Sequence, residues 1–173
     1  MSDVTNYKSF LMSPLKLTYR HHVLPGDVSA VKDMAESTGF FYDFEIPVAV
    51  ELVEDALIDG EHSPYKFLFA EVDGKPVSYT CYGHILGTEA GYDLFWIITH
   101  NDYRGKGIGK IILEETHRII RELGGKYVIA ETSGLEKYIP TRKFYLNFGY
   151  KLEAEIRDYY KAGDSKAIFI YRF

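Results

Sequence analysis

Glycines and basic residues alternate in one short stretch in the middle of the chain, residues 104–110, which reads Arg-Gly-Lys-Gly-Ile-Gly-Lys. The stretch follows residues 92–99, whose Phe, Trp and Ile content is typical of a central strand. After it, Ile108 and Ile112 stand at helical spacing. A glycine-rich turn from a strand into a helix can hold an anion, because its backbone N–H groups approach the ligand and the helix N-terminus adds a favourable field. The alternative is a tight turn with solvated basic side chains.

The spacing of these glycines excludes two common nucleotide sites. A Walker loop needs a glycine, four further residues and then Gly-Lys-Ser/Thr, which this stretch does not contain. The dinucleotide pattern G-x-G-x-x-G fails as well, because Gly105 and Gly107 are followed by Lys110 at the position of the last glycine. The pattern that fits is Arg-x-x-Gly-x-Gly, formed by Arg104, Gly107 and Gly109.

The composition is that of a single globular domain. The chain has 173 residues, of which 46% are hydrophobic and 26% charged. A net charge of −5 argues against a protein that coats nucleic acid. No apolar run is long enough for a signal peptide or a membrane span. Cys81 is the only cysteine, and its apolar and aromatic neighbours in the sequence fit a packed core thiol better than a nucleophile. We therefore expect a cytoplasmic protein with no nucleic-acid or membrane partner.

The elements that must position the glycine loop alternate between strands and helices. We expect a tail over residues 1–14 and one domain over residues 15–173. The predicted strands cover residues 15–23, 66–72, 76–85, 92–99, 126–130, 152–159 and 167–173, and the predicted helices cover 27–38, 45–59, 108–123 and 140–148. In the third helix, Ile112, Ile119 and Leu123 are expected on the buried face.

Two segments resemble one known superfamily. Residues 96–110 closely resemble the pyrophosphate-binding motif of the GNAT N-acetyltransferases, and residues 141–150, Thr-Arg-Lys-Phe-Tyr-Leu-Asn-Phe-Gly-Tyr, resemble the superfamily's Ala-x-x-Phe-Tyr-x-x-x-Gly-Phe helix. The order of elements is similar over residues 15–173. The resemblance implies the α/β (α+β) GNAT fold, in which about four helices flank a mixed, mostly antiparallel sheet of six to seven strands that is splayed at its middle.

The resemblance also implies acetyl-CoA as cosubstrate, without a metal. In the superfamily the pantetheine of acetyl-CoA enters the gap between the splayed strands. The resemblance therefore implies that the backbone of Ile97, Ile98 and Thr99 holds the acetyl carbonyl and the pantetheine. Backbone groups of the glycine loop would hold the pyrophosphate; the loop comprises Arg104, Gly105, Lys106, Gly107, Ile108, Gly109 and Lys110. Tyr138 stands where many members have an asparagine that contacts the cofactor, and is included with the cofactor-binding residues despite this departure.

Acetyl transfer to an amine needs two proton transfers. The resemblance places Tyr145 where a tyrosine often protonates the leaving thiolate; a reference pKa of about 10 lets a tyrosine hold that proton until late in the reaction. The base is Asp93 or Glu131, or a water relay without a dedicated side chain. Strand alternation would put Asp93 on one face with Phe95 and Ile97, where burial raises a carboxyl pKa.

For the acceptor we expect a primary amine of a small molecule or an amino-acid derivative. The aromatic stretch of residues 39–45 would line its site, with Asp43 or Glu45 facing the amine. A protein N-terminus or an internal lysine is the alternative; Tyr159 and Tyr160 resemble the region where protein N-terminal acetyltransferases hold a peptide. A non-catalytic acyl-CoA-binding sensor is the alternative of another class, and a homodimer stays open.

Overall fold

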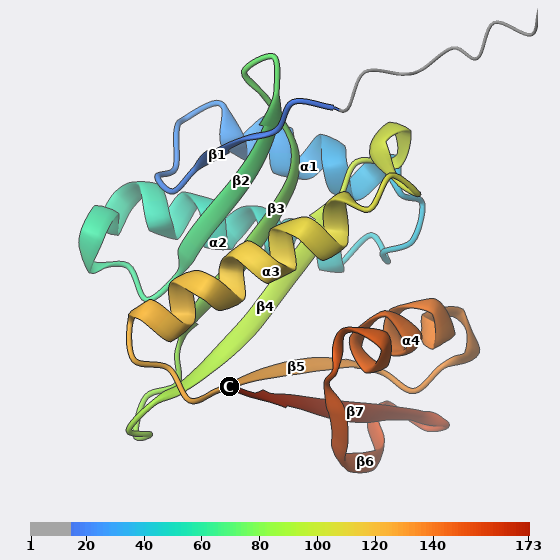
Figure 1. The fold of residues 1–173 in the computed structure, drawn as a ribbon. Coiled ribbons are helices and arrows are strands. Elements are labelled where there is room, and N and C mark those ends of the chain that lie inside the picture. The colour runs from blue at the N-terminus through green and yellow to red at the C-terminus, as the bar shows by residue number, and fades with distance from the viewer. Residues whose placement is uncertain (1–14) are drawn as a thin grey trace, which may run out of the picture.

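A mixed sheet of seven strands organises the fold (Figure 1). The computed structural model describes residues 15–173; the predicted tail, residues 1–14, lies outside them. Neighbouring strands follow the order β1-β2-β3-β4-β5-β7-β6, and every pair is antiparallel except the parallel pair β4–β5. The strands are β1 (Thr18–Arg20), β2 (Lys66–Val72), β3 (Lys75–His84), β4 (Gly91–Thr99), β5 (Tyr127–Ser133), β6 (Lys151–Lys161) and β7 (Asp164–Arg172).

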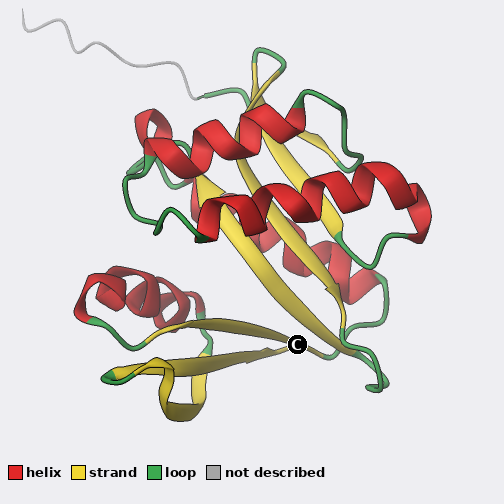
Figure 2. Ribbon diagram, turned by 180° about the vertical axis from the view of Figure 1, so that it is seen from behind, coloured by secondary structure: helices red, strands yellow, loops and turns green. Residues whose placement is uncertain are grey.

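Helices cover both faces of the sheet. They are α1 (Asp27–Ser37), α2 (Glu45–Asp59), α3 (Ile108–Glu122) and α4 (Ile139–Phe148). Figure 2 shows α1 and α2 together on one face, with α3 behind the strands on the other. None of the helices that the structure describes has the length and apolar character needed to cross a membrane.

The sheet opens between β4 and β5. Their parallel pairing runs only from Gly91 opposite Tyr127 to Leu94 opposite Ala130, although both strands continue beyond it. Figure 1 shows the two strands meeting at one end and diverging toward the other. The splayed, mostly antiparallel sheet expected from the sequence is thereby confirmed, and the opening leaves one edge of β4 without a neighbouring strand.

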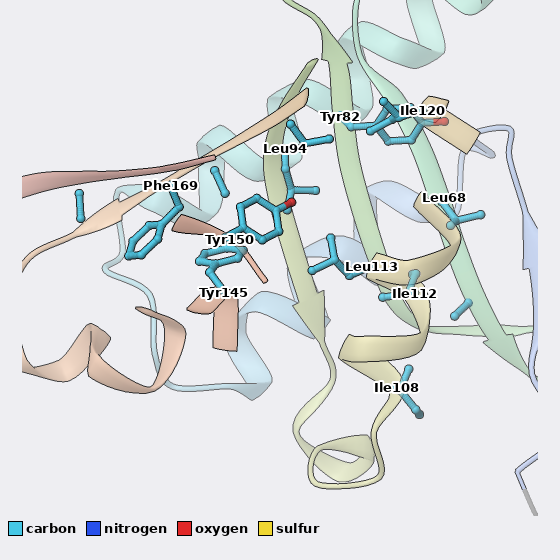
Figure 3. Close-up of a cluster of buried hydrophobic side chains, with 14 of the residues drawn as sticks. Leu68, Tyr82, Leu94, Ile108, Ile112, Leu113, Ile120, Tyr145, Tyr150 and Phe169 are labelled. Atoms are coloured by element: carbon cyan, nitrogen blue, oxygen red, sulfur yellow. The ribbon is translucent and has the colours of Figure 1, made fainter. Parts of the chain in front are cut away.

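Two apolar clusters hold the layers together. On the α3 and α4 side, Ile112, Leu113 and Tyr145 pack with residues of the sheet, and Figure 3 shows Tyr145 beside Tyr150 and Phe169. On the other side, residues of α1 and α2 pack against β2 and β3. The second cluster contains Cys81, and because it is completely buried, burial raises the pKa of its thiol well above the usual range. The expectation of a packed core thiol is confirmed.

A bulge in β4 changes which side chains share a face. Phe95 has no partner on β3, and the register shifts there by one residue. Leu94 and Ile97 therefore both pack toward the α3 cluster, although strict alternation would place them on opposite faces. The expectation that Asp93 shares a face with Ile97 is wrong for this reason.

Several predicted boundaries also differ from the observed ones. The first strand is only three residues long, Thr18–Arg20, instead of the predicted residues 15–23. Its last residue, Arg20, forms ion pairs with Asp27 and Glu71 at 2.7 Å. Leu123 is 60% exposed rather than buried, since α3 ends at Glu122 and the chain turns away. The last strand begins at Asp164, earlier than predicted, and this brings a new carboxylate into the sheet.

Candidate active site

A cavity of about 980 Å³ lies at the opening between β4 and β5. It is bounded by the α1–α2 connection, by β4 and β5, by the glycine loop, and by α4 and the start of β7. Most of the site residues expected from the sequence line it: Asp93, Ile97, Ile98, Thr99, Arg104, Gly105, Gly107, Ile108, Gly109, Lys110, Glu131, Tyr138 and Tyr145. Lys106 does not; its ammonium donates to the Asp102 carbonyl at 2.9 Å and lies over the Tyr103 ring.

The glycine loop has the geometry of an anion cradle. Gly105 and Gly107 have φ of 72° and 78°, values that side chains other than glycine rarely adopt. The first hydrogen bond of α3 runs from the Ile111 N–H to the Gly107 carbonyl, so the N–H groups of residues 108–110 have no partner within the helix. Arg104 and Lys110 add positive charge at the cavity wall.

Gly109 lets the helix start lie flush with the cavity. A Cβ at this position would meet Thr99 Oγ1 at 3.7 Å and the Phe144 ring at 3.8 Å, which are ordinary contacts. No positive φ requires glycine here. The absence of a side chain therefore matters for the space in the cavity rather than for the protein's own packing, and the loop fits the diphosphate of a coenzyme.

Tyr145 lies where α4 faces the cavity. The residue is 5% exposed, and burial raises the pKa of its hydroxyl above the usual range. Among the described residues no polar atom forms a hydrogen bond with that hydroxyl. The Tyr145 hydroxyl is therefore protonated and can donate a hydrogen bond, and no described residue accepts one from it.

The two candidate bases, Asp93 and Glu131, stand on either side of the opening. Asp93 lies opposite Ile129 in the parallel ladder, and Glu131 follows two residues later. Burial raises the pKa of Asp93, the negative charge of Glu131 raises it further, and the ammonium of Lys166 opposes both. Glu131 forms an ion pair with Lys166, with 2.5 Å between Oε2 and Nζ. Asp93 is thus a carboxylate whose affinity for a proton is raised, and Glu131 is paired with a cation.

Sequence reasoning missed Lys166 and Asp164. Both belong to β7, which pairs with β5 so that Lys166 lies opposite Ser133. The Lys166 ammonium also lies 3.9 Å from the centroid of the Tyr159 ring. Periodicity and motif spacing carry no signal for these residues, because their roles depend on a strand pairing between segments about 30 residues apart.

The wall opposite β7 is aromatic and closely connected. Tyr138 is 6% exposed, its ring packs edge-on against Phe40, and its hydroxyl donates to Glu45 at 3.3 Å. The ammonium of Lys137 lies 3.3 Å from the centroid of Tyr42 and donates to the Phe40 carbonyl. The expected aromatic stretch therefore lines the site with Glu45, whereas Asp43 does not line it.

Comparison with known proteins agrees with this architecture. The family model of the acetyltransferase (GNAT) domain matches residues 63–152. A protein from Desulfovibrio desulfuricans, described as an acetyltransferase of the GNAT family, is 41% identical with a TM-score of 0.88, and the match covers 91% of this chain and 99% of that one. No curated protein sequence matches the chain significantly.

More distant solved structures share the fold alone. The Escherichia coli enzyme that acetylates an alanine of a ribosomal protein has a TM-score of 0.70 at 17% identity, covering 91% of this chain and 94% of that one. An aminoglycoside 6'-N-acetyltransferase solved with coenzyme A also has a TM-score of 0.70, at 13% identity, covering 90% and 96%. The chain belongs to the GNAT acetyltransferase family and is an acetyltransferase.

Proposed function

We propose that this protein transfers the acetyl group of acetyl-CoA to a primary amine of a small molecule. The observation that carries the proposal is the continuity of the cavity. It runs from the free N–H groups at the start of α3, past the unpaired edge of β4, to Asp93 and Glu131. Arg104 and Lys110 line the cofactor end, whereas four carboxylates and the ammonium of Lys137 line the other end. This charge distribution suits an anionic coenzyme and a cationic acceptor.

The cofactor is held by backbone groups in this proposal. The N–H groups of residues 108–110 bind the diphosphate, with Arg104 and Lys110 nearby, and Ile97, Ile98 and Thr99 present the edge of β4 to the pantetheine and the acetyl carbonyl. We assign Lys106 only its backbone, since its side chain is directed to Asp102 and Tyr103. We place Tyr138 with the acceptor wall, because its hydroxyl is engaged by Glu45.

The chemistry follows from the two proton sites. Asp93 takes a proton from the ammonium of the acceptor, and the free amine attacks the thioester carbonyl. The C–N bond forms, the C–S bond breaks, and Tyr145 gives its proton to the departing thiolate. The nitrogen loses its second proton through water to the Tyr145 phenolate, and Asp93 releases the first proton to solvent, so that both groups return to their starting states. Asp93 suits the role of base because burial and Glu131 raise its pKa. Glu131 forms an ion pair with Lys166, and its negative charge raises the pKa of Asp93.

Connections across the acceptor end support a small molecule. Lys137 donates to the Phe40 carbonyl, and Tyr138 donates to Glu45, so the segment before α4 is attached to the α1–α2 connection. Lys161 of the β6–β7 hairpin lies 5.8 Å from the Tyr42 ring. These links bound the acceptor end on several sides, whereas a polypeptide needs an open groove. Similarity of the overall fold does not distinguish a protein acceptor from a small-molecule acceptor, because protein-acetylating and aminoglycoside-acetylating structures match equally well.

The first experiment is calorimetric titration with acetyl-CoA, with ATP and NAD as controls. We expect saturable binding that is specific for the coenzyme. Release of free thiol is then followed with a panel of small amines, an N-terminal peptide and a lysine peptide. Turnover only with peptides would replace the small-molecule acceptor, and binding without turnover with any amine would favour a sensor. Absence of binding would contradict the proposal as a whole.

A further inference from the structure

Two aspartates of the described chain are almost completely buried, and they differ in their partners. Asp27 is 2% exposed, and Arg20 donates to both of its carboxylate oxygens, at 2.7 and 2.8 Å. Asp164 is 4% exposed, and its Oδ1 accepts one hydrogen bond, from the Ser133 hydroxyl at 2.5 Å. No cation of the described residues lies within ion-pair distance of it. A buried carboxylate normally has a cation, so Asp164 lacks a partner that Asp27 has.

Asp164 lines the acceptor end of the cavity, at the first position of β7. Its second carboxylate oxygen has no hydrogen-bond partner among the described residues, yet it is not sealed in the interior. The nearest available cation on the same strand, Lys166, is already paired with Glu131 at 2.5 Å. The open oxygen of Asp164 is therefore available to something that enters the cavity.

Aromatic rings stand close to this carboxylate. Tyr138 and Tyr160 both line the cavity. The charge of Asp164 contributes to the raised pKa of each hydroxyl, after the larger effects of burial and of nearer groups. A cavity lined by a carboxylate and by aromatic rings is a common environment for a bound ammonium. In the same wall, the Lys137 ammonium lies 3.3 Å from the centroid of the Tyr42 ring.

We infer that Asp164 binds a second ammonium group of the acceptor, so that the preferred substrates are diamines or larger oligoamines. One amine is deprotonated beside Asp93 and reacts, while the other stays charged, pairs with Asp164 and lies against Tyr138 and Tyr160. This inference rests on the proposed acetyl transfer to a small amine and adds its substrate class. A monoamine of the same length leaves Asp164 without its cation and binds less well.

The test compares pentane-1,5-diamine with pentylamine and 5-aminopentan-1-ol. Binding to the protein saturated with coenzyme A is measured by ligand-observed NMR titration, and acetyl transfer is measured by thiol release. For the wild type we expect the diamine to have at least about tenfold higher affinity and kcat/KM than either monoamine. Asp164→Asn should abolish this advantage and leave the monoamines within about threefold of wild type. The matched control is Asp59→Asn, an exposed aspartate at the end of α2, which should keep the preference.

Thermal unfolding separates recognition from a structural role. Asparagine can still accept the Ser133 hydrogen bond, and the substitution removes an unpaired buried charge. We therefore expect Asp164→Asn to melt at the wild-type temperature or up to about 4 °C above it.

Three results would overturn the inference: equal binding of diamine and monoamine by the wild type, an equal loss for both acceptors in Asp164→Asn, or a fall in its melting temperature by several degrees. Failure of the proposed function is visible separately. A protein that binds the diamine through Asp164 but neither binds acetyl-CoA nor releases thiol would contradict acetyl transfer while supporting the ammonium site. Equal rates of acetyl transfer to all amines would support acetyl transfer and contradict the ammonium site at Asp164.

Discussion

At the scale of single residues, Tyr145 and Tyr150 make a natural comparison. They are neighbours in the same buried cluster, with ring centroids 5.2 Å apart. The Tyr150 hydroxyl is hydrogen-bonded to His117 Nε2 at 2.7 Å, whereas that of Tyr145 has no such bond among the described residues and its residue lines the cavity. Among the described residues, the Tyr145 hydroxyl is therefore available to a group that enters the cavity, whereas the Tyr150 hydroxyl is already engaged by His117.

Tyr145→Phe should lower kcat about 10- to 1,000-fold and leave stability nearly unchanged, because the protein loses an acid but no internal hydrogen bond. Tyr150→Phe is the control: it should keep kcat and lose about 1 kcal/mol of unfolding free energy with the His117 bond. Steady-state kinetics and urea unfolding of both variants check this. A wild-type kcat in Tyr145→Phe would remove the residue from the mechanism.

The second residue-scale prediction concerns Asp93. Since the base must be deprotonated, kcat/KM rises with pH through the pKa of Asp93, which burial and Glu131 raise. Asp93→Asn should remove that rise and lower kcat/KM by about 100-fold or more. Glu131→Gln should move it to lower pH, because a negative charge is lost; Lys166→Met should move it to higher pH, because a positive charge is lost.

These pH profiles are measured with one acceptor, so that the amine's own titration is the same in every variant. Loss of the rise in Glu131→Gln instead of Asp93→Asn would make Glu131 the base. Identical profiles for all three variants would favour a water relay.

At the scale of elements, the start of α3 combines a required and a replaceable glycine. Gly107 has φ of 78° and is restricted by its backbone, but Gly109 has room for a methyl group that would project beside Thr99 and Phe144. Gly109→Ala should therefore fold normally, with up to about 1 kcal/mol more stability, and bind coenzyme A at least about tenfold more weakly.

Calorimetry and thermal unfolding of Gly109→Ala measure the two effects. The matched control is Gly26→Ala, at a position before α1 with an ordinary φ of −68° and no atoms within contact distance of the new methyl. It should leave coenzyme affinity unchanged. Equal affinity in both variants would show that the diphosphate does not approach the helix start.

The elements also mark where sequence reasoning ends. The glycine loop and the adjacent strands predicted at residues 66–72 and 76–85 are local features, and the sequence pattern predicts them correctly. The bulge at Phe95 is not visible in a one-strand pattern, because it depends on the register with β3. The cluster of Asp93, Glu131 and Lys166 needs three strands in register, so only its members on β4 and β5 could be proposed from the motifs around them.

At the scale of the whole molecule, the two halves of the splayed sheet are joined partly through one buried histidine. His117 of α3 is 4% exposed and lies against four aromatic rings of the C-terminal part of the chain: Phe148, Tyr150, Tyr171 and Phe173. Burial, with a smaller contribution from the charge of Arg121, lowers the pKa of His117 to about 4. The contact between the two halves is therefore most stable when the His117 ring is neutral.

This depressed pKa makes stability depend on pH in one direction. Between about pH 6.5 and pH 4 the unfolded chain binds a proton at His117 that the folded chain excludes, so stability is complete above pH 6.5 and is lost as the pH falls. The loss amounts to at most on the order of 3 kcal/mol.

His117→Gln should unfold more easily at pH 7.5, and its deficit in unfolding free energy relative to wild type should shrink toward pH 4. Urea unfolding at several pH values measures the difference, with the exposed His62→Gln as control. Parallel stability curves for wild type and His117→Gln would mean that His117 has the same pKa in the folded and the unfolded chain, which would contradict the lowered pKa.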